Sequence, residues 1–237
     1  MRISGGNQKS RVALACVVVA ALIVGVPKSA TSQAVAQSTG VVEAQLQRAE
    51  TAWRSGASML EAKARVDRVL DMHPDHGEAL RLRSFINLSM RSVEEAFADA
   101  VRAVEALPED AGAHVAFVEA ARLSGRNYRA SEALDRALSL LDSSLDYHLR
   151  LSWNALQLEH FDHAESLARV ALQAHPEEPG PYYQLARVFQ ATDREGDAVL
   201  TLKRGFERRV LSWSAIEGDA LLNEYTSHEA LQPFRKR

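Results

Sequence analysis

The sequence predicts an all-α chain built from one structural unit that repeats every 34 residues. Alanine recurs at that spacing five times, at Ala62, Ala96, Ala130, Ala164 and Ala198. A second column with the same period is apolar throughout and contains Leu70, Val104, Leu138, Leu172 and Phe206. Hydrophobic residues make up 46% of the 237 residues, while only 12 are glycine and 7 are proline. That composition excludes a chain of short strands joined by tight turns.

Each unit contains two amphipathic helices. In the last unit, one face of the first helix carries residues at the i, i+3, i+4 and i+7 positions, namely Tyr182, Leu185, Ala186 and Phe189. Small residues are expected where two helices cross, because a larger side chain holds the backbones beyond a packing distance of about 8–10 Å. A proline ends the second helix in three units, because the residue before a proline is pushed out of the α region. These prolines are Pro74, Pro108 and Pro176.

These patterns resemble the tetratricopeptide repeat family, whose 34-residue helix–turn–helix unit has small residues at the helix crossing and a proline after the second helix. The clearest match is the segment 181–189, PYYQLARVF, followed by Ala198. The resemblance implies a right-handed α-solenoid with capping helices over residues 213–237. A short linker at 37–42 would precede five repeats, which span 43–76, 77–110, 111–144, 145–178 and 179–212.

Two residues depart from the family pattern. Glu50 occupies a usually small position in the first repeat, where a terminal repeat can leave it in solvent. Arg83 occupies a usually apolar position in the second repeat, and the sequence offers no reason for it.

The first 36 residues carry the three parts of a secretory signal peptide. Basic residues Arg2, Lys9 and Arg11 precede the apolar run 12–26, and a polar stretch then ends in the A-x-A sequence at 34–36. As a helix the apolar run would extend about 22 Å, short of a hydrocarbon layer of roughly 30 Å. We therefore expect cleavage after the A-x-A sequence and an exported protein, periplasmic or secreted. The alternative is an uncleaved inner-membrane anchor, since tilt and thinning accommodate such a mismatch.

Residues that could carry chemistry are few. Two histidine pairs, His73 with His76 and His160 with His163, each have an aspartate between them, but no third or fourth ligand is near in sequence. We therefore expect no metal. The sequence contains no glycine-rich phosphate loop, no nucleophile elbow and no H-E-x-x-H motif. We expect no catalytic residue and no cofactor, so the protein is predicted not to be an enzyme.

In the tetratricopeptide family the first helices line a concave groove that binds peptides or partner helices. By this resemblance, the groove residues of the present chain are Arg54, Arg81, Phe85, Leu88, Arg122, Leu149, Trp153, Leu156, Tyr183 and Arg187. Trp153 is the strongest candidate, because its column also holds threonine, glutamate and arginine, which are unsuited to a core. The alternative interpretation is that the apolar members extend the core between repeats.

The expected partner is a protein or peptide with an apolar segment flanked by acidic residues, since arginines are spread along the predicted groove. The net charge of −3 gives no basis for nucleic-acid binding, and membrane contact is expected only if the segment 1–36 is retained. The sequence thus predicts an exported scaffold or adaptor for bacterial cell-envelope assembly, secretion, or pilus or polysaccharide machinery. The alternative is a membrane-tethered accessory subunit of an envelope enzyme or transporter.

Overall fold

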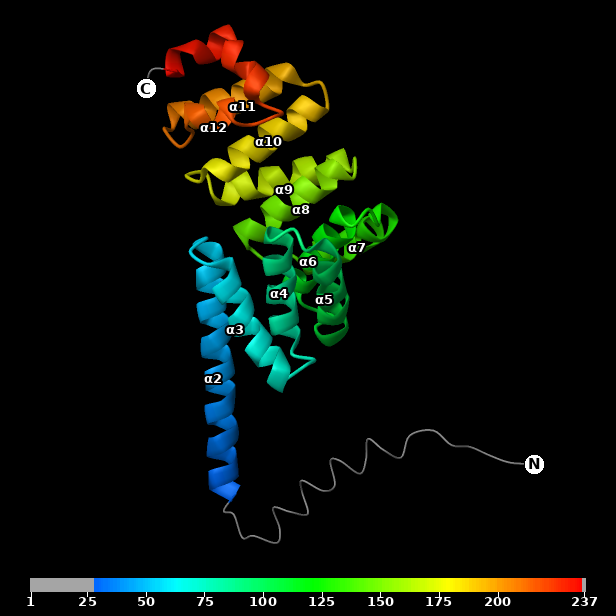
Figure 1. Ribbon diagram of the computed structural model, residues 1–237. Helices are drawn as coiled ribbons and strands as arrows, with labels where there is room; N and C mark the ends of the chain where they lie inside the picture. Colours follow the sequence, from blue (N-terminus) through cyan, green and yellow to red (C-terminus); the bar gives the residue numbers. More distant parts are fainter. Residues whose placement is uncertain (1–27, 236–237) are drawn as a thin grey trace, which may run out of the picture.

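The computed structural model describes residues 28–235, which form five successive pairs of antiparallel helices and a helical C-terminal cap (Figure 1). The first helices of the pairs are α2 (Lys28–Arg54), α4 (Gly77–Ser89), α6 (Ala111–Leu123), α8 (Leu145–Gln157) and α10 (Pro179–Ala191). The second helices are α3 (Met59–Met72), α5 (Val93–Ala106), α7 (Asn127–Leu140), α9 (Phe161–Ala174) and α11 (Glu195–Glu207). The predicted all-α solenoid of helix–turn–helix repeats is confirmed.

The 34-residue period is visible in the turns as well as in the helices. Four of the first helices begin 34 residues apart, at Gly77, Ala111, Leu145 and Pro179. The turn inside each of these repeats passes through the left-handed region at one equivalent residue, with φ between 56° and 75°. These residues are Arg91, Gly125, Glu159 and Asp193. Only one of the four is glycine, so the packing of each helix pair holds the other three in a conformation that side chains disfavour.

The repeat-packing alanines lie where the paired helices cross. Ala62, Ala96, Ala130, Ala164 and Ala198 are all fully buried. In two repeats the helices are close enough for a serine of the first helix to bond the carbonyl of this alanine: Ser84 Oγ donates to Ala96 O at 2.9 Å, and Ser152 Oγ donates to Ala164 O at 2.7 Å. The methyl side chain therefore fits a site with no room for a longer one.

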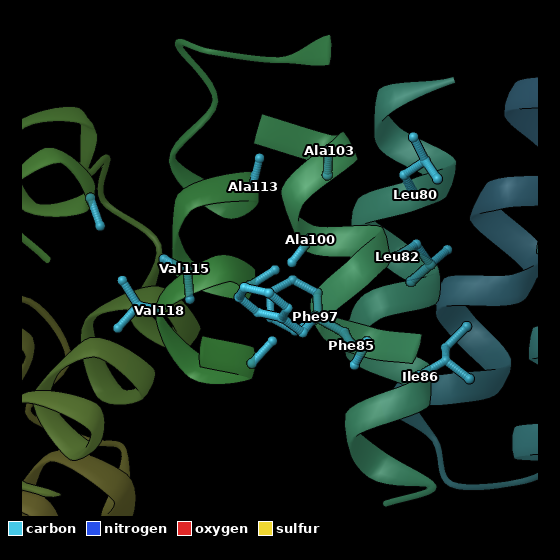
Figure 2. Close-up of a cluster of buried hydrophobic side chains, with 14 of the residues drawn as sticks. Leu80, Leu82, Phe85, Ile86, Phe97, Ala100, Ala103, Ala113, Val115 and Val118 are labelled. Atoms are coloured by element: carbon cyan, nitrogen blue, oxygen red, sulfur yellow. The ribbon is translucent and has the colours of Figure 1, made fainter. Parts of the chain in front are cut away.

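Between repeats, larger side chains fill the space that the alanines leave. Figure 2 shows this packing where α4, α5 and α6 meet, with Phe85, Phe97 and Val115 among the buried residues. The rings of Phe97 and Phe117 pack at 5.6 Å between centroids. The core therefore continues from one repeat to the next instead of forming separate units.

Arg83, unexplained by the sequence, holds three helices together. Its guanidinium donates to both carboxylate oxygens of Asp99 on α5, at 2.7 and 2.8 Å, and to Asp67 Oδ1 on α3 at 3.0 Å. The side chain of Asp99 is only 7% exposed, so removing the arginine would leave a buried charge without its partner. Glu50 is half-buried and pairs with Arg54 at 2.8 Å.

Residues 213–235 cover the exposed face of the last repeat. They form α12 (Trp213–Glu217) and two short 3-10 helices, η1 (Asn223–Ser227) and η2 (Glu229–Phe234). Their apolar side chains Ile216, Leu222 and Leu231 are fully buried, and Phe234 stacks on Phe206 of α11 at 5.3 Å between ring centroids. The segment thus closes the end of the solenoid, as the sequence predicts.

The expected linker at 37–42 is wrong, because α2 begins at Lys28 and includes those residues. The stretch 28–42 contains no proline and one glycine, Gly40, so nothing in it stops the helix from extending backwards from the first repeat. The basic residues and apolar run of the predicted signal peptide, at 1–26, lie outside the described residues. Within 28–235, none of the helices combines the length and hydrophobicity that a membrane span requires.

Leucine in place of Ala130 or Ala164 is expected to lower the free energy of unfolding by about 1–3 kcal/mol, because the longer side chain overpacks a full crossing. Ala230→Leu serves as the control, since Ala230 is exposed on η2. Urea unfolding followed by circular dichroism measures all three variants. Equal midpoints would mean that these alanines do not lie at tight crossings.

Candidate functional site

The first helices of successive repeats lie beside one another and form the concave face of the solenoid. α4 contacts α6, α6 contacts α8, and α8 contacts α10. The array curves enough for the first and fourth repeats to meet across this face. Arg54 Nη1 of α2 lies 3.8 Å from Asp146 Oδ2 of α8, and the guanidinium of Arg150 lies 5.5 Å from the centre of the Trp53 ring.

Side chains of α8 fill much of the N-terminal half of the concave face. Trp53 and Phe85 stack with 5.6 Å between centroids, and the guanidinium of Arg150 lies 4.8 Å from the centre of the Phe85 ring. Arg150 also pairs with Glu119 at 2.9 Å and with Asp146 at 3.1 Å. Desolvation by burial is the largest single influence and acts to lower the pKa of Arg150, but the charges and hydrogen bonds of Glu119 and Asp146 together favour the charged form, so the pKa is raised. This cation holds α8 over the aromatic pair.

Arg81 lies beside this filled region and is also engaged within the molecule. Its Nη1 donates to both carboxylate oxygens of Asp110 at 3.0 Å. The hydroxyl of Tyr147 and the guanidinium of Arg81 approach the backbone of Gly112 so closely that a Cβ there would collide with both. A hollow of about 200 Å³ remains between α2, α4 and α8.

A larger hollow, of about 410 Å³, lies in the C-terminal half of the concave face. We call it the α8–α10 hollow; its lining includes Leu149, Trp153, Asn154, Tyr183, Gln184 and Arg187. The absence of a side chain at Gly180 brings Leu149 against α10, since a Cβ there would lie 2.7 Å from Leu149 Cδ1. Tyr183 is held by its hydroxyl, which accepts from Ser212 N at 3.0 Å. The hollow thus presents an aliphatic and two aromatic side chains in fixed positions.

The polar lining of the α8–α10 hollow is organised around Arg187. Its Nε donates to Asp219 Oδ2 at 2.7 Å, and its guanidinium lies 5.4 Å from the centre of the Trp153 ring. Arg187 Nη1 also donates to Gln184 Oε1 at 3.3 Å. Gln184 is 2% exposed, and its Nε2 atom has no hydrogen-bond partner. Gln184 was not among the predicted groove residues, because its column mixes polar and apolar residues and carries no clear signal.

Arg122 differs from the other predicted groove arginines. Its Nε donates to Asn154 Oδ1 at 2.6 Å, and among residues 28–235 no carboxylate forms an ion pair with it. Desolvation by burial lowers the pKa of Arg122, and the nearby charge of Glu119 offsets that effect only in part. A guanidinium nevertheless stays protonated at neutral pH. Arg54, Arg81 and Arg187, in contrast, are paired with Glu50, Asp110 and Asp219.

The structure therefore divides the ten predicted groove residues into three groups. Phe85 and Leu156 are 4% exposed and belong to the core, and Leu88 is half-buried against it. Arg54 and Arg81 line the smaller hollow beside α2. The third group comprises four residues that line the α8–α10 hollow and Arg122, which does not line it but bonds to the lining residue Asn154. The four are Leu149, Trp153, Tyr183 and Arg187.

One histidine of each pair has a structural hydrogen-bond partner. His76 Nδ1 accepts from the backbone N–H of Ala79 and caps α4, and His160 Nε2 forms a hydrogen bond with Ser131 Oγ at 3.0 Å. In the part of the chain that the structure describes, no group of three or more histidine, cysteine, aspartate or glutamate side chains is placed to hold a metal ion.

Paired helices stacked in this way, with small residues at every crossing, define a tetratricopeptide repeat solenoid. No protein-family model matches the sequence, and no curated protein matches it. Solved structures share the fold. The type IV pilus biogenesis factor PilW has 20% identity and a TM-score of 0.65, over 82% of this chain and 90% of that chain.

Two further solved structures agree with this assignment. A thermophilic TPR protein from Thermus thermophilus has 20% identity and a TM-score of 0.62, over 80% of this chain and 98% of that chain. YrrB, a TPR protein with an unusual peptide-binding site, has 13% identity and a TM-score of 0.54, over 82% and 96%. These likenesses show that the present protein has the tetratricopeptide repeat fold.

The division between core and hollow can be tested with one substitution at two positions of α8. Leu156→Ala is expected to lower the free energy of unfolding by about 2–5 kcal/mol, because it leaves a cavity in the core. Leu149→Ala removes a half-buried side chain at the hollow and is expected to cost about 1 kcal/mol. Chemical unfolding measures both variants. A Leu149→Ala cost as large as that of Leu156→Ala would place Leu149 in the core.

Proposed function

We propose that this protein is a non-enzymatic scaffold that binds a segment of a partner protein on its concave face, at the α8–α10 hollow. The observation that carries the proposal is the hollow itself, where Leu149, Trp153 and Tyr183 stand beside polar groups on adjacent first helices. Large, rigid apolar side chains with a polar rim are typical of the residues that dominate protein-binding energies. The N-terminal half of the face is less suitable, since Arg150 covers its aromatic pair.

The lining of the hollow supports binding rather than catalysis. Its charged side chains are engaged in ion pairs, Arg150 with Glu119 and Asp146, and Arg187 with Asp219. A general acid or base needs a titratable group free to exchange a proton with a substrate. The fold comparison points in the same direction, because YrrB is a TPR protein with a peptide-binding site.

We place this scaffold outside the cytoplasm, in cell-envelope assembly, secretion, or pilus or polysaccharide machinery. The basic and apolar pattern of residues 1–36 supports export, and the similar fold of PilW, a type IV pilus biogenesis factor, supports an envelope role. The second candidate is a membrane-tethered accessory subunit of an envelope enzyme or transporter. It is favoured by the apolar run 12–26, which would act as the anchor if it is retained.

The mass of the native protein distinguishes the two candidates. Cleavage after residue 36 is expected, so intact-mass spectrometry of the protein from its natural host should detect a chain that begins at Gln37. A full-length chain recovered in the membrane fraction would contradict the exported scaffold and favour the tethered subunit.

Truncation of Trp153 tests the binding role. Trp153→Ala is expected to weaken partner binding by about 2 kcal/mol, roughly thirty-fold, because it removes a rigid anchor from the hollow. Because the ring is half-buried and packs against the core, Trp153→Ala is also expected to lower the free energy of unfolding by about 1–2 kcal/mol, so binding is compared per folded molecule. Partners are first identified by affinity capture from envelope extracts, and affinities are then measured by calorimetry.

Tyr128→Ala is the matched control, because this aromatic ring is 76% exposed on α7 and lies outside the hollow. It should bind as the wild type does. If Trp153→Ala melts the array and leaves binding unchanged per folded molecule, Trp153 belongs to the core and the proposed site is wrong.

A further inference from the structure

Another hollow, of about 560 Å³, opens between the second helices α9 and α11, on the convex side of the solenoid. We call it the α9–α11 hollow. α10 packs against both helices and forms the floor of the hollow with one helical face, made of Tyr182, Leu185 and Phe189. Tyr183 and Arg187, on the opposite face of α10, line the α8–α10 hollow instead. The two hollows therefore lie on opposite sides of α10.

Exposed apolar residues gather beside the α9–α11 hollow where the other repeats have small, polar or charged ones. Leu200 on α11 lines the hollow and is 45% exposed. The equivalent residues of the earlier repeats are Ala64, Ala98, Glu132 and Ser166.

Val170 on α9 follows the lining residue Arg169 in sequence and is 47% exposed. Its position holds an arginine in the other four repeats, at Arg68, Arg102, Arg136 and Arg204. A single exposed apolar side chain needs no explanation, but two beside one hollow mark an interaction surface.

The shape of the α9–α11 hollow suits a helix. Its floor residues are buried, while Leu172 on α9 and Leu200 on α11 reach the surface from the two walls. A helix is about 10 Å across, and its i, i+3, i+4 and i+7 side chains share one face. An amphipathic helix from another protein can therefore lie over α10 with its apolar face toward these two leucines.

The charges around the α9–α11 hollow leave one cation in excess. Arg169 and Arg194 share the carboxylate of Glu165, at 2.6 and 2.8 Å, and Asp197 pairs with Arg194 at 2.7 Å. Arg204 also lines the hollow and is exposed, and no ion pair within residues 28–235 involves it. An incoming carboxylate can reach this guanidinium without displacing an acid of the protein.

We propose that the α9–α11 hollow is a second docking surface, which binds one amphipathic helix of a partner protein. Large apolar side chains of that helix pack on Leu172 and Leu200, and an acidic side chain pairs with Arg204. This surface goes beyond the proposed function, because it lies across α10 from the α8–α10 hollow and can be occupied at the same time. The scaffold then holds two partners, one on each face.

The docking surface is tested with a phage-displayed library of a helical 18-residue peptide, randomised at the i, i+3, i+4 and i+7 positions of one face and selected on the full chain. Selected helices should combine large apolar residues with an aspartate or glutamate on that face. No selected helix, or selected helices without an acid, would overturn the inference.

Leu200→Ser tests the apolar contact, and serine is the residue that the fourth repeat has at the equivalent position. The affinity of a selected helix should fall about ten-fold, with little change in melting temperature because Leu200 is nearly half exposed. Leu60→Ser is the matched control, since Leu60 is 72% exposed on α3 and lies outside the hollow. Helices that bind Leu200→Ser normally but lose affinity for Trp153→Ala would support the proposed function and overturn this inference.

Arg204→Gln tests the charge contact. Each selected helix is paired with a copy in which its acid is replaced by the neutral amide. The wild type should prefer the acidic helix about five-fold at low salt, and Arg204→Gln should lose that preference. Arg68→Gln changes an exposed arginine at the equivalent position of the first repeat and should retain it. An unchanged preference in Arg204→Gln would overturn the assignment of Arg204.

Analytical ultracentrifugation distinguishes a partner helix from a second copy of this chain. The wild type and Leu200→Ser are expected to sediment alike over the concentrations used for binding. A wild type that self-associates, together with a monomeric Leu200→Ser, would show that a second copy occupies the hollow and would overturn the proposed partner helix.

Discussion

The structure depends on the close approach of the two helices within each repeat. That approach requires a methyl group at the crossing, and the hydroxyl of Ser152 bonding to the carbonyl of Ala164 shows how little space separates the backbones. A fixed crossing also fixes the path of the turn between the two helices. A residue with φ in the left-handed region therefore recurs at the same place in the turn, even where that residue is Arg91 or Glu159. Similar helix pairs then stack with the same small rotation from one repeat to the next, and these rotations add up to the curvature of the solenoid.

Curvature decides which part of the concave face is open. It brings α8 opposite α2, where Arg150 lies over Trp53 and Phe85 while its charge is shared by two acids. A cation–aromatic contact of this kind gains strength from desolvation, and the side chains of α8 leave only the smaller hollow of about 200 Å³ in the N-terminal half. Among residues 28–235, the lining of the C-terminal hollow comes from the successive first helices α6, α8 and α10, and no residue of α2 or α4 contributes to it. The hollow beside Trp153 is therefore a consequence of the same geometry.

The sequence was sufficient to predict the repeats, because the 34-residue period and the helical period of 3.6 residues are both visible in the spacing of residues along the chain. By helix phase it could also group Trp153 and Tyr183 on one face of the first helices, and the resemblance to tetratricopeptide repeats identified that face as the concave one. It could not separate Phe85 and Leu156 from them, since curvature, not phase, decides which concave residues are covered. The role of Arg83 was equally hidden, because its partners, Asp67 and Asp99, lie on other helices, 16 residues away in each direction.

The pattern of unpaired buried polar atoms gives a further reason to propose the α8–α10 hollow as the binding site. Two buried side-chain atoms among the described residues have no partner, Asn87 Oδ1 and Gln184 Nε2. The first is a carbonyl oxygen in the core between α4 and α5, and an unpaired acceptor of that type is tolerated more often than an unpaired N–H. The second is an N–H group of Gln184, a residue in the lining of the α8–α10 hollow, and the atom itself is buried. Local rules of protein structure are broken most often at functional sites, and of these two exceptions the one at Gln184 lies in the lining of the proposed site.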